Sequence, residues 1–197
     1  VMVTSSLPSE GKSSFSAAIG RLAAAAGTKT LLIDADLRRP SLAKIFPGLE
    51  REVKLEDLLQ NESNPHEAIA VDPQTNLHIL FAHGKTPLTA ELLGSRRMQQ
   101  LLDLLAQEYE LILIDTPPIM GISDGWKLAR HIDALVYLVE WAETPRETVL
   151  TSLRQLEVIG INPTGLVLSK VNMRQQQQYG YGGYGYYYSK YQNYYHN

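Results

Sequence analysis

Residues 1–14 read VMVTSSLPSEGKSS and join a short apolar run to a Gly-Lys-Ser sequence. Residues 1–4 are typical of the end of a strand, and the alanine-rich stretch 12–26, followed by Gly27, is typical of a helix. A glycine between a strand and a helix lets backbone N–H groups face a phosphate, which the positive end of the helix also attracts. The stretch therefore predicts a phosphate-binding loop, in preference to an ordinary strand-to-helix connection.

The loop is a variant of the pattern G-x-x-x-x-G-K-[ST], with Ser6 in place of the first glycine. In such loops the lysine, here Lys12, reaches the β- and γ-phosphates of ATP, and the following hydroxyl, here Ser13, ligates Mg²⁺. The residues expected to contact ATP are Pro8, Ser9, Glu10, Gly11, Lys12, Ser13 and Ser14.

Residues 1–172 alternate between strand and helix patterns. Further strands are predicted at 30–34, 77–81, 111–115, 134–139 and 165–168. Helices are predicted at 90–107, after Ser123, and from the Thr144 region to about residue 159. For the last helix, Thr144 is predicted as the cap, with Glu147 completing a capping box. The alternation predicts an α/β fold of the P-loop NTPase type, a parallel sheet with helices on both faces.

Acidic side chains follow two of the predicted strands. Asp34 and Asp36 end the run 30–36, and Asp115 closes the run 111–115. A lone D-x-D is more often a solvated turn, but ligands of such sheets bind beyond the carboxyl ends of the strands. Together with the phosphate-binding loop, the three carboxylates predict a site for ATP and Mg²⁺.

The overall composition excludes several classes of protein. The 197 residues carry 18 Lys and Arg against 21 Asp and Glu, a net charge of −3, and no cysteine. The absence of cysteine rules out a disulfide scaffold, a thiol nucleophile and a cysteine-ligated zinc site. A weakly acidic chain is a poor general nucleic-acid binder, so no nucleic-acid partner is expected. Because the chain opens within a strand, we expect it to be a fragment of a protein whose upstream part includes any membrane anchor.

The C-terminal segment has a composition of its own. Nine of the 11 tyrosines lie between Tyr179 and Tyr195, and residues 173–197 carry Arg174, Lys190 and no acid, a charge of +2. Such a segment lacks the aliphatic residues needed for a core, which predicts a disordered tail at 173–197 after a globular domain at 1–172. Taken alone, the tail also fits a self-associating linker or, less well because of its low charge, a platform for single-stranded nucleic acid.

Three motifs and the tail together carry a family resemblance. The motifs are SSLPSEGKSS at 5–14, LLIDADLRRP at 31–40 and LILIDTPP at 111–118, and the tail adds the tyrosine cluster. In these features the chain resembles the bacterial tyrosine kinases of polysaccharide export, over essentially its whole length.

The resemblance implies roles for the strand-end residues. Lys12 would hold and polarise the transferred phosphoryl group, while Ser13, Asp36 and Asp115 would organise Mg²⁺. A tyrosine hydroxyl has a pKa near 10, so a carboxylate must take or orient its proton; Asp34 is favoured for this, although the sequence does not separate it from Asp36. The phospho-acceptors would be Tyr179, Tyr181, Tyr184, Tyr186, Tyr187, Tyr188, Tyr191, Tyr194 and Tyr195.

The resemblance also implies a biological setting. The expected activity is ATP-dependent autophosphorylation of the tyrosine cluster, which would regulate capsule or exopolysaccharide synthesis and export. The expected partners are a membrane adaptor that activates the kinase, fused upstream or separate, further copies of the parent protein in a ring, and a tyrosine phosphatase. The expected location is the cytoplasmic face of the bacterial inner membrane. Two alternatives stay open, a partition-type P-loop ATPase and an ATP-controlled assembly scaffold, and neither would phosphorylate tyrosine.

Overall fold

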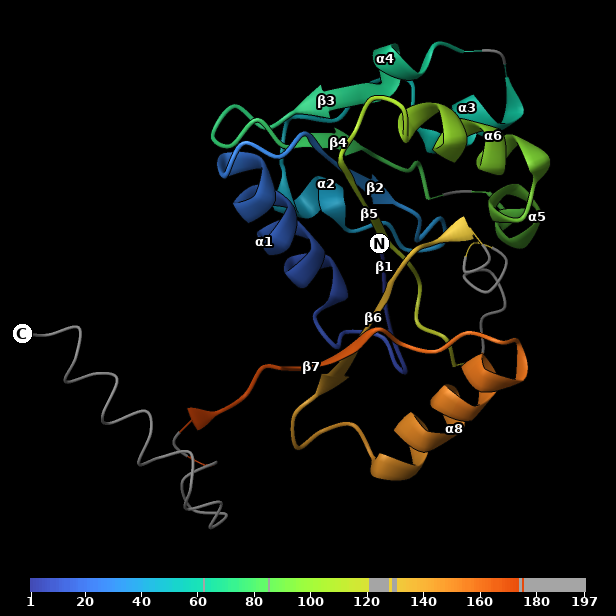
Figure 1. Ribbon diagram of the computed structural model, residues 1–197. Helices are drawn as coiled ribbons and strands as arrows, with labels where there is room; N and C mark the ends of the chain where they lie inside the picture. The colour runs from blue at the N-terminus through green and yellow to red at the C-terminus, as the bar shows by residue number, and fades with distance from the viewer. Residues whose placement is uncertain (62, 85, 121–127, 129–130, 174, 176–197) are drawn as a thin grey trace, which may run out of the picture.

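The computed structural model describes residues 1–61, 63–84, 86–120, 128, 131–173 and 175 (Figure 1). The predicted helix after Ser123 and the nine tail tyrosines lie outside these residues. Within them, no helix has the length and apolar character that crossing a membrane requires.

A seven-stranded sheet forms the centre of the described part, with the strand order β3-β4-β2-β5-β1-β6-β7. Six strands run parallel, as predicted, and only the edge strand β3 is antiparallel to its neighbour β4. The strand β3 was not predicted from the sequence, because three residues are too few to show a period. The strands are β1 Met2–Ser5, β2 Thr30–Asp34, β3 Ile69–Val71, β4 His78–Leu80, β5 Leu111–Asp115, β6 Leu135–Glu140 and β7 Gly165–Ser169.

Helices cover both faces of the sheet, as the alternating pattern predicts (Figure 1). Leu32 of β2 packs in a cluster with residues of α1 and α2, whereas its neighbours Leu31 and Ile33 pack with α3, α5 and α6 on the opposite face. Met2 and Tyr137 pack with α8 in a third cluster. The described helices are α1 Lys12–Ala25, α2 Leu42–Ile45, α3 Leu55–Gln60, α4 Pro65–Ala68, α5 Thr89–Leu93, α6 Arg96–Leu105 and α8 Arg146–Val158.

One predicted helix is divided in two. The prediction of a single helix over 90–107 is wrong, because α5 ends at Leu93 and α6 starts at Arg96. Ser95 lies between them as the N-cap of α6, and its hydroxyl accepts a hydrogen bond from the Met98 N–H at 3.1 Å. The apolar spacing continues across the break, which is why periodicity alone joined the two helices.

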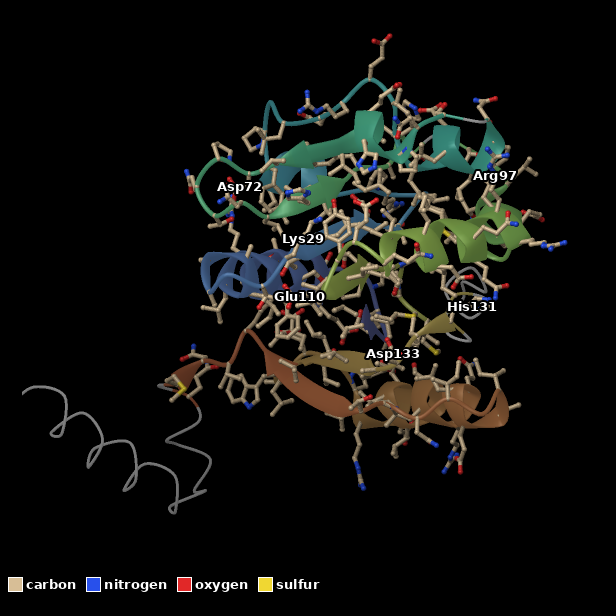
Figure 2. All side chains as sticks on the ribbon, turned by 45° about the horizontal axis from the view of Figure 1, so that its top comes forward. Lys29, Asp72, Arg97, Glu110, His131 and Asp133 are labelled. Atoms are coloured by element: carbon tan, nitrogen blue, oxygen red, sulfur yellow. The ribbon has the colours of Figure 1, made fainter. Side chains whose placement is uncertain are left out.

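The parallel strands bring the predicted site residues to one edge of the sheet. Asp34 and Asp115 are register partners at the ends of β2 and β5, and Val3 of β1 pairs with Asp115. At the opposite edge, where β2 and β5 begin, the Glu110 carboxylate accepts the Lys29 N–H at 3.0 Å (Figure 2). Residues far apart in the sequence therefore meet where β1, β2 and β5 end.

Candidate active site

The loop between β1 and α1 has the backbone of a phosphate cradle. Ser9 and Gly11 have φ values of 67° and 91°, in the left-handed region that glycine favours. Gly11 is also the N-cap of α1, and it has no side chain to accept the first N–H groups of the helix. The positive end of α1 is thus presented towards the loop, as anion binding requires.

Ser6, which replaces the first glycine of the usual pattern, has a structural partner. Its Oγ lies 2.5 Å from the hydroxyl of Tyr137 on β6, and both residues are fully buried. A glycine would leave the tyrosine hydroxyl without this hydrogen bond, so the serine suits a loop that packs against an aromatic residue.

The Glu10 carboxylate fixes the position of the loop by hydrogen bonds. It is buried and accepts hydrogen bonds from the Leu7 N–H at 2.6 Å, the Glu140 N–H at 3.3 Å and the Thr144 hydroxyl. Glu10 is not among the described residues that line the cavity over the loop. Its side chain therefore ties the loop to the end of β6, while its backbone remains part of the cradle.

The bond from Thr144 to Glu10 overturns one prediction. Pro145, rather than Thr144, is the N-cap of α8, and no side chain caps the helix there, so the predicted capping box with Glu147 is wrong. The Thr144 hydroxyl instead donates to the carboxylate of Glu10, which lies 134 positions earlier in the chain. A local pattern cannot reveal a competing partner of this kind.

Two further residues at the end of β7 support the loop, and neither was predicted from the sequence. The Ser169 hydroxyl donates to the Glu10 carbonyl at 2.6 Å. The Lys170 ammonium donates to the Ser9 carbonyl at 2.6 Å and pairs with Glu140 at 2.9 Å. The only signal in the sequence is their place directly after a predicted strand.

A cavity of about 850 Å³ lies over the loop. One wall is the loop and the start of α1, and the other is the segment that follows β2. Of the predicted site residues, Lys12, Ser13 and Asp36 line this cavity, whereas Asp34 and Asp115 are not among the described lining residues. The full lining is Pro8, Ser9, Gly11, Lys12, Ser13, Ser14, Asp36, Arg38, Arg39, Ser41, Lys44, Ile45, Pro118 and Lys170.

Lys12 is held among polar groups at the base of the cavity. The residue is only 7% exposed, and its ammonium donates to Ser5 Oγ at 3.1 Å. Burial lowers the pKa of Lys12, and the negative charges of Asp115 and Asp36 act against that shift. The ammonium thus lies close to two carboxylates and within reach of an anion in the cavity.

Asp115 has one carboxylate oxygen without a partner. Its Oδ1 accepts from the Ser16 hydroxyl at 3.4 Å, but no described group bonds to its buried Oδ2. Burial raises the pKa of Asp115 to about 6, although a hydrogen bond from Ser13 and the charge of Lys12 act in the opposite direction. An unpaired buried oxygen beside a hydroxyl is an arrangement that a divalent cation would complete.

Asp34, by contrast, is surrounded by donors. Its Oδ2 accepts the N–H groups of Ser41 and Leu42, each at 3.0 Å, and its Oδ1 accepts the Asp36 N–H at 3.3 Å. Burial, followed by the charge of Asp115, raises the pKa of Asp34 to about 8 against these backbone hydrogen bonds. The Asp34 side chain therefore fixes the backbone of the segment that follows β2.

Asp36 is the partly exposed carboxylate of the pair after β2. Its Oδ1 accepts the Arg39 N–H at 3.0 Å, and its side chain lines the cavity. Ser13 lies against the same segment, because its Oγ accepts from the Ser41 hydroxyl at 2.6 Å. No group of three His, Asp or Glu side chains that could hold a metal ion lies among the described residues.

Comparison with known proteins agrees with this geometry. Residues 9–136 match the AAA domain family. The chain is 32% identical to the tyrosine-protein kinase YwqD of Bacillus subtilis over 183 residues, 93% of this chain and 77% of that protein. It is 32% identical to the succinoglycan biosynthesis transport protein ExoP of Rhizobium meliloti, but spans only 23% of that protein.

Solved structures give the same grouping. The kinase domain of VpsO superposes with a TM-score of 0.80 at 34% identity, covering 87% of this chain and 84% of that domain. The cell division protein MinD of Aquifex aeolicus has a TM-score of 0.72 at 21% identity, over 90% of this chain and 71% of that one, which is a likeness of fold. Motifs, fold and relatives agree: this chain belongs to the bacterial tyrosine kinases, a family of P-loop proteins with an AAA domain.

Proposed function

We propose that this chain transfers the γ-phosphoryl group of ATP to tyrosines of its own C-terminal cluster. The observation that carries the proposal is the meeting of Lys12, Ser13 and Asp36 on one cavity, with the unpaired Asp115 oxygen beneath it. Family membership supports the choice of tyrosine as acceptor, because relatives are named tyrosine-protein kinases.

The reaction forms one bond and breaks one. The phenol oxygen bonds to the γ-phosphorus, the bond from that phosphorus to the β–γ bridging oxygen breaks, and ADP leaves with the electron pair. Lys12 would stabilise the charge on the transferred group. Asp36 would take the phenol proton, because it lines the cavity, whereas Asp34 is engaged with three backbone N–H groups.

The donor set fits a bound Mg²⁺. Ser13, Asp36 and Asp115 are the residues proposed to hold it, directly or through water, with the ATP phosphates completing the shell. When bound, the ion neutralises phosphate charge. The unpaired Oδ2 of Asp115 supports this assignment.

The acceptors and partners are proposed from the family and the sequence. The acceptors are Tyr179, Tyr181, Tyr184, Tyr186, Tyr187, Tyr188, Tyr191, Tyr194 and Tyr195. A membrane adaptor would activate the kinase at the inner face of the membrane, copies of the parent protein would form a ring, and a phosphatase would reset the tail. The name of ExoP supports a role in exopolysaccharide synthesis.

Intact-mass spectrometry tests the proposal. The chain is isolated from cells and compared with phosphatase-treated protein and with Lys12→Met, whose melting temperature is the control for folding. We expect tail adducts of about 80 Da in the wild type only, with the rate of phosphorylation at least about 100-fold lower in the variant.

ATP hydrolysis without labelled tyrosine, in protein that carries its activator, would instead support the partition-type ATPase. ATP binding with negligible turnover would support the scaffold.

A further inference from the structure

The cavity has a second wall, whose cations are not used in the proposed binding of ATP. Beyond the loop, the segment after β2 contributes Arg38, Arg39 and Lys44 to the lining, and all three are exposed residues. Against them, Asp36 is the single carboxylate among the described lining residues. We call Arg38, Arg39 and Lys44 the basic wall.

The backbone under the basic wall is held in one conformation. The buried Asp34 carboxylate accepts N–H groups from both sides of the turn, at Asp36 and at Ser41 and Leu42. The Asp36 carboxylate accepts the Arg39 N–H at 3.0 Å. The backbone of this turn is therefore ordered before an anion binds, and only the side chains lose conformational freedom on binding.

A neighbouring loop packs directly against this turn. Gly84 has a φ of 76°, and a Cβ there would meet the ring of Pro40 at 2.4 Å, so the two residues are in close contact. The buried Glu56 carboxylate accepts the N–H groups of His83 and Gly84 at 2.8 to 3.0 Å. The Glu56 carboxylate therefore fixes the loop at His83 and Gly84, which packs against the turn of the basic wall.

The basic wall lies at the place where an acceptor would sit. The Ser41 hydroxyl, at the base of the wall, donates to the Ser13 hydroxyl at 2.6 Å, and Asp36 lies on the same wall. If Lys12 and Ser13 hold the γ-phosphate, the attacking tyrosine has to enter beside these three cations.

Charge indicates which form of the tail the basic wall favours. The unmodified segment 173–197 carries +2 and no acid, so three cations repel it. Each phosphate on a tyrosine adds about −1.5 to −2 and three strong acceptor oxygens, which arginine side chains bind well. The wall is therefore complementary to the product of the reaction and not to its substrate.

We infer that Arg38, Arg39 and Lys44 form a binding subsite for a phosphotyrosine of the C-terminal tail. A tail that already carries one phosphate is retained beside the transfer site, so that neighbouring tyrosines, such as those at 186–188, are phosphorylated in the same encounter. This inference rests on the proposed tyrosine kinase function.

Peptide binding tests the subsite without requiring catalysis. The full chain with its nine tail tyrosines changed to phenylalanine is saturated with Mg²⁺–ADP and titrated into fluorescent peptides of residues 179–195. The peptides carry either no phosphate or one phosphate on Tyr187, and binding is followed by fluorescence anisotropy. We expect the phosphopeptide to bind at least about tenfold more tightly, and added salt to weaken it.

A matched pair of variants locates the effect. In R38Q/R39Q/K44Q the preference for the phosphopeptide should fall to within about twofold, whereas R51Q/R96Q/R154Q removes the same charge from other exposed sites and should keep it. Equal binding of the two peptides by the wild-type wall would overturn the inference. So would a preference that survives the wall substitutions, or one that the control substitutions also remove.

Nucleotide affinity separates the basic wall from the ATP site. A fluorescent ADP analogue should bind R38Q/R39Q/K44Q as tightly as it binds the control variant. An equal loss of ADP and phosphopeptide affinity would assign the three cations to the nucleotide and contradict the subsite.

The distribution of phosphates on the intact tail gives a second readout. At a matched average phosphate content, the control variant should show unmodified chains alongside chains with several phosphates, whereas the wall variant should accumulate chains with one. Identical distributions would contradict retention of the tail. If instead no tyrosine is phosphorylated at all while the phosphopeptide still binds, the proposed function fails and the subsite stands.

Discussion

Asp34 and Asp115 end adjacent strands at the same register, and both are almost completely buried, at 0% and 1% exposure. Their surroundings nevertheless differ. Asp34 accepts three backbone N–H groups from its own strand-end segment, whereas Asp115 has an oxygen to which no described group donates a hydrogen bond. The end of β2 thus has its hydrogen bonds completed within the chain, and the end of β5 does not.

The difference indicates that two similar carboxylates have separate tasks. A carboxylate whose oxygens are satisfied by backbone donors fixes a local conformation. A buried carboxylate with a free oxygen is costly unless a cation or donor completes it, which is the expected state of a metal-binding residue before its ion arrives. Burial raises the pKa of both groups, and they differ in their hydrogen bonds and in the charge of Lys12, which acts against the shift at Asp115.

The largest effect is expected in the rate of tail phosphorylation when Asp115→Asn is compared with Asp34→Asn. Asp115→Asn should lower the rate of tail phosphorylation by about 100-fold or more, because it removes the charge proposed to organise Mg²⁺, while Asp34→Asn should lower it by less than about tenfold. Phosphotyrosine formation over time, with Mg²⁺ in excess, measures both rates. Equal losses would show that the comparison is wrong.

Stability should show the reverse order. Asp34→Ala leaves the N–H groups of Ser41 and Leu42 without their acceptor, whereas Asp34→Asn keeps an acceptor oxygen, and neither variant has to bind a proton at pH 7. The free energy of unfolding of Asp34→Ala should therefore be about 2–4 kcal/mol below that of Asp34→Asn. Urea unfolding of the nucleotide-free protein measures the difference, and Asp115→Asn, which loses no backbone partner, is the matched control. An alanine variant as stable as the asparagine variant would show that Asp34 does not stabilise the segment after β2.

The smallest effect is expected in the pH dependence of stability. Because the pKa of Asp34 is raised to about 8 from 3.8, the folded state binds its proton more tightly than the unfolded state, and this contribution is lost as pH rises through 8. Between pH 7 and 8, the wild type should lose about 1 kcal/mol relative to Asp34→Asn. Unfolding curves of the two proteins at pH 7 and 8 provide the measurement, and parallel profiles would contradict the shifted pKa.

Much of the fold could be predicted because its signals are local. The continuous apolar runs at 30–34 and 111–115 are typical of strands buried on both faces, and both strands have these bounds in the structure. The break at Ser95 and the strand β3 were missed, because one depends on a cap inside a continuous apolar pattern and the other on pairing with β4. Local pattern predicts an element better than it predicts where the element is interrupted.

Within the site, the sequence by itself determined the phosphate-binding loop and the set of strand-end carboxylates, because motif spacing and strand ends are properties of neighbouring residues. Only the tertiary structure decided which groups meet. It brought the Glu10 carboxylate to Thr144, Lys170 to the Ser9 carbonyl, and Asp36 rather than Asp34 to the cavity. The physical reason is that a carboxylate's role depends on the donors around it. For Glu10, two of those donors, the Glu140 N–H and the Thr144 hydroxyl, lie 130 and 134 positions away along the chain.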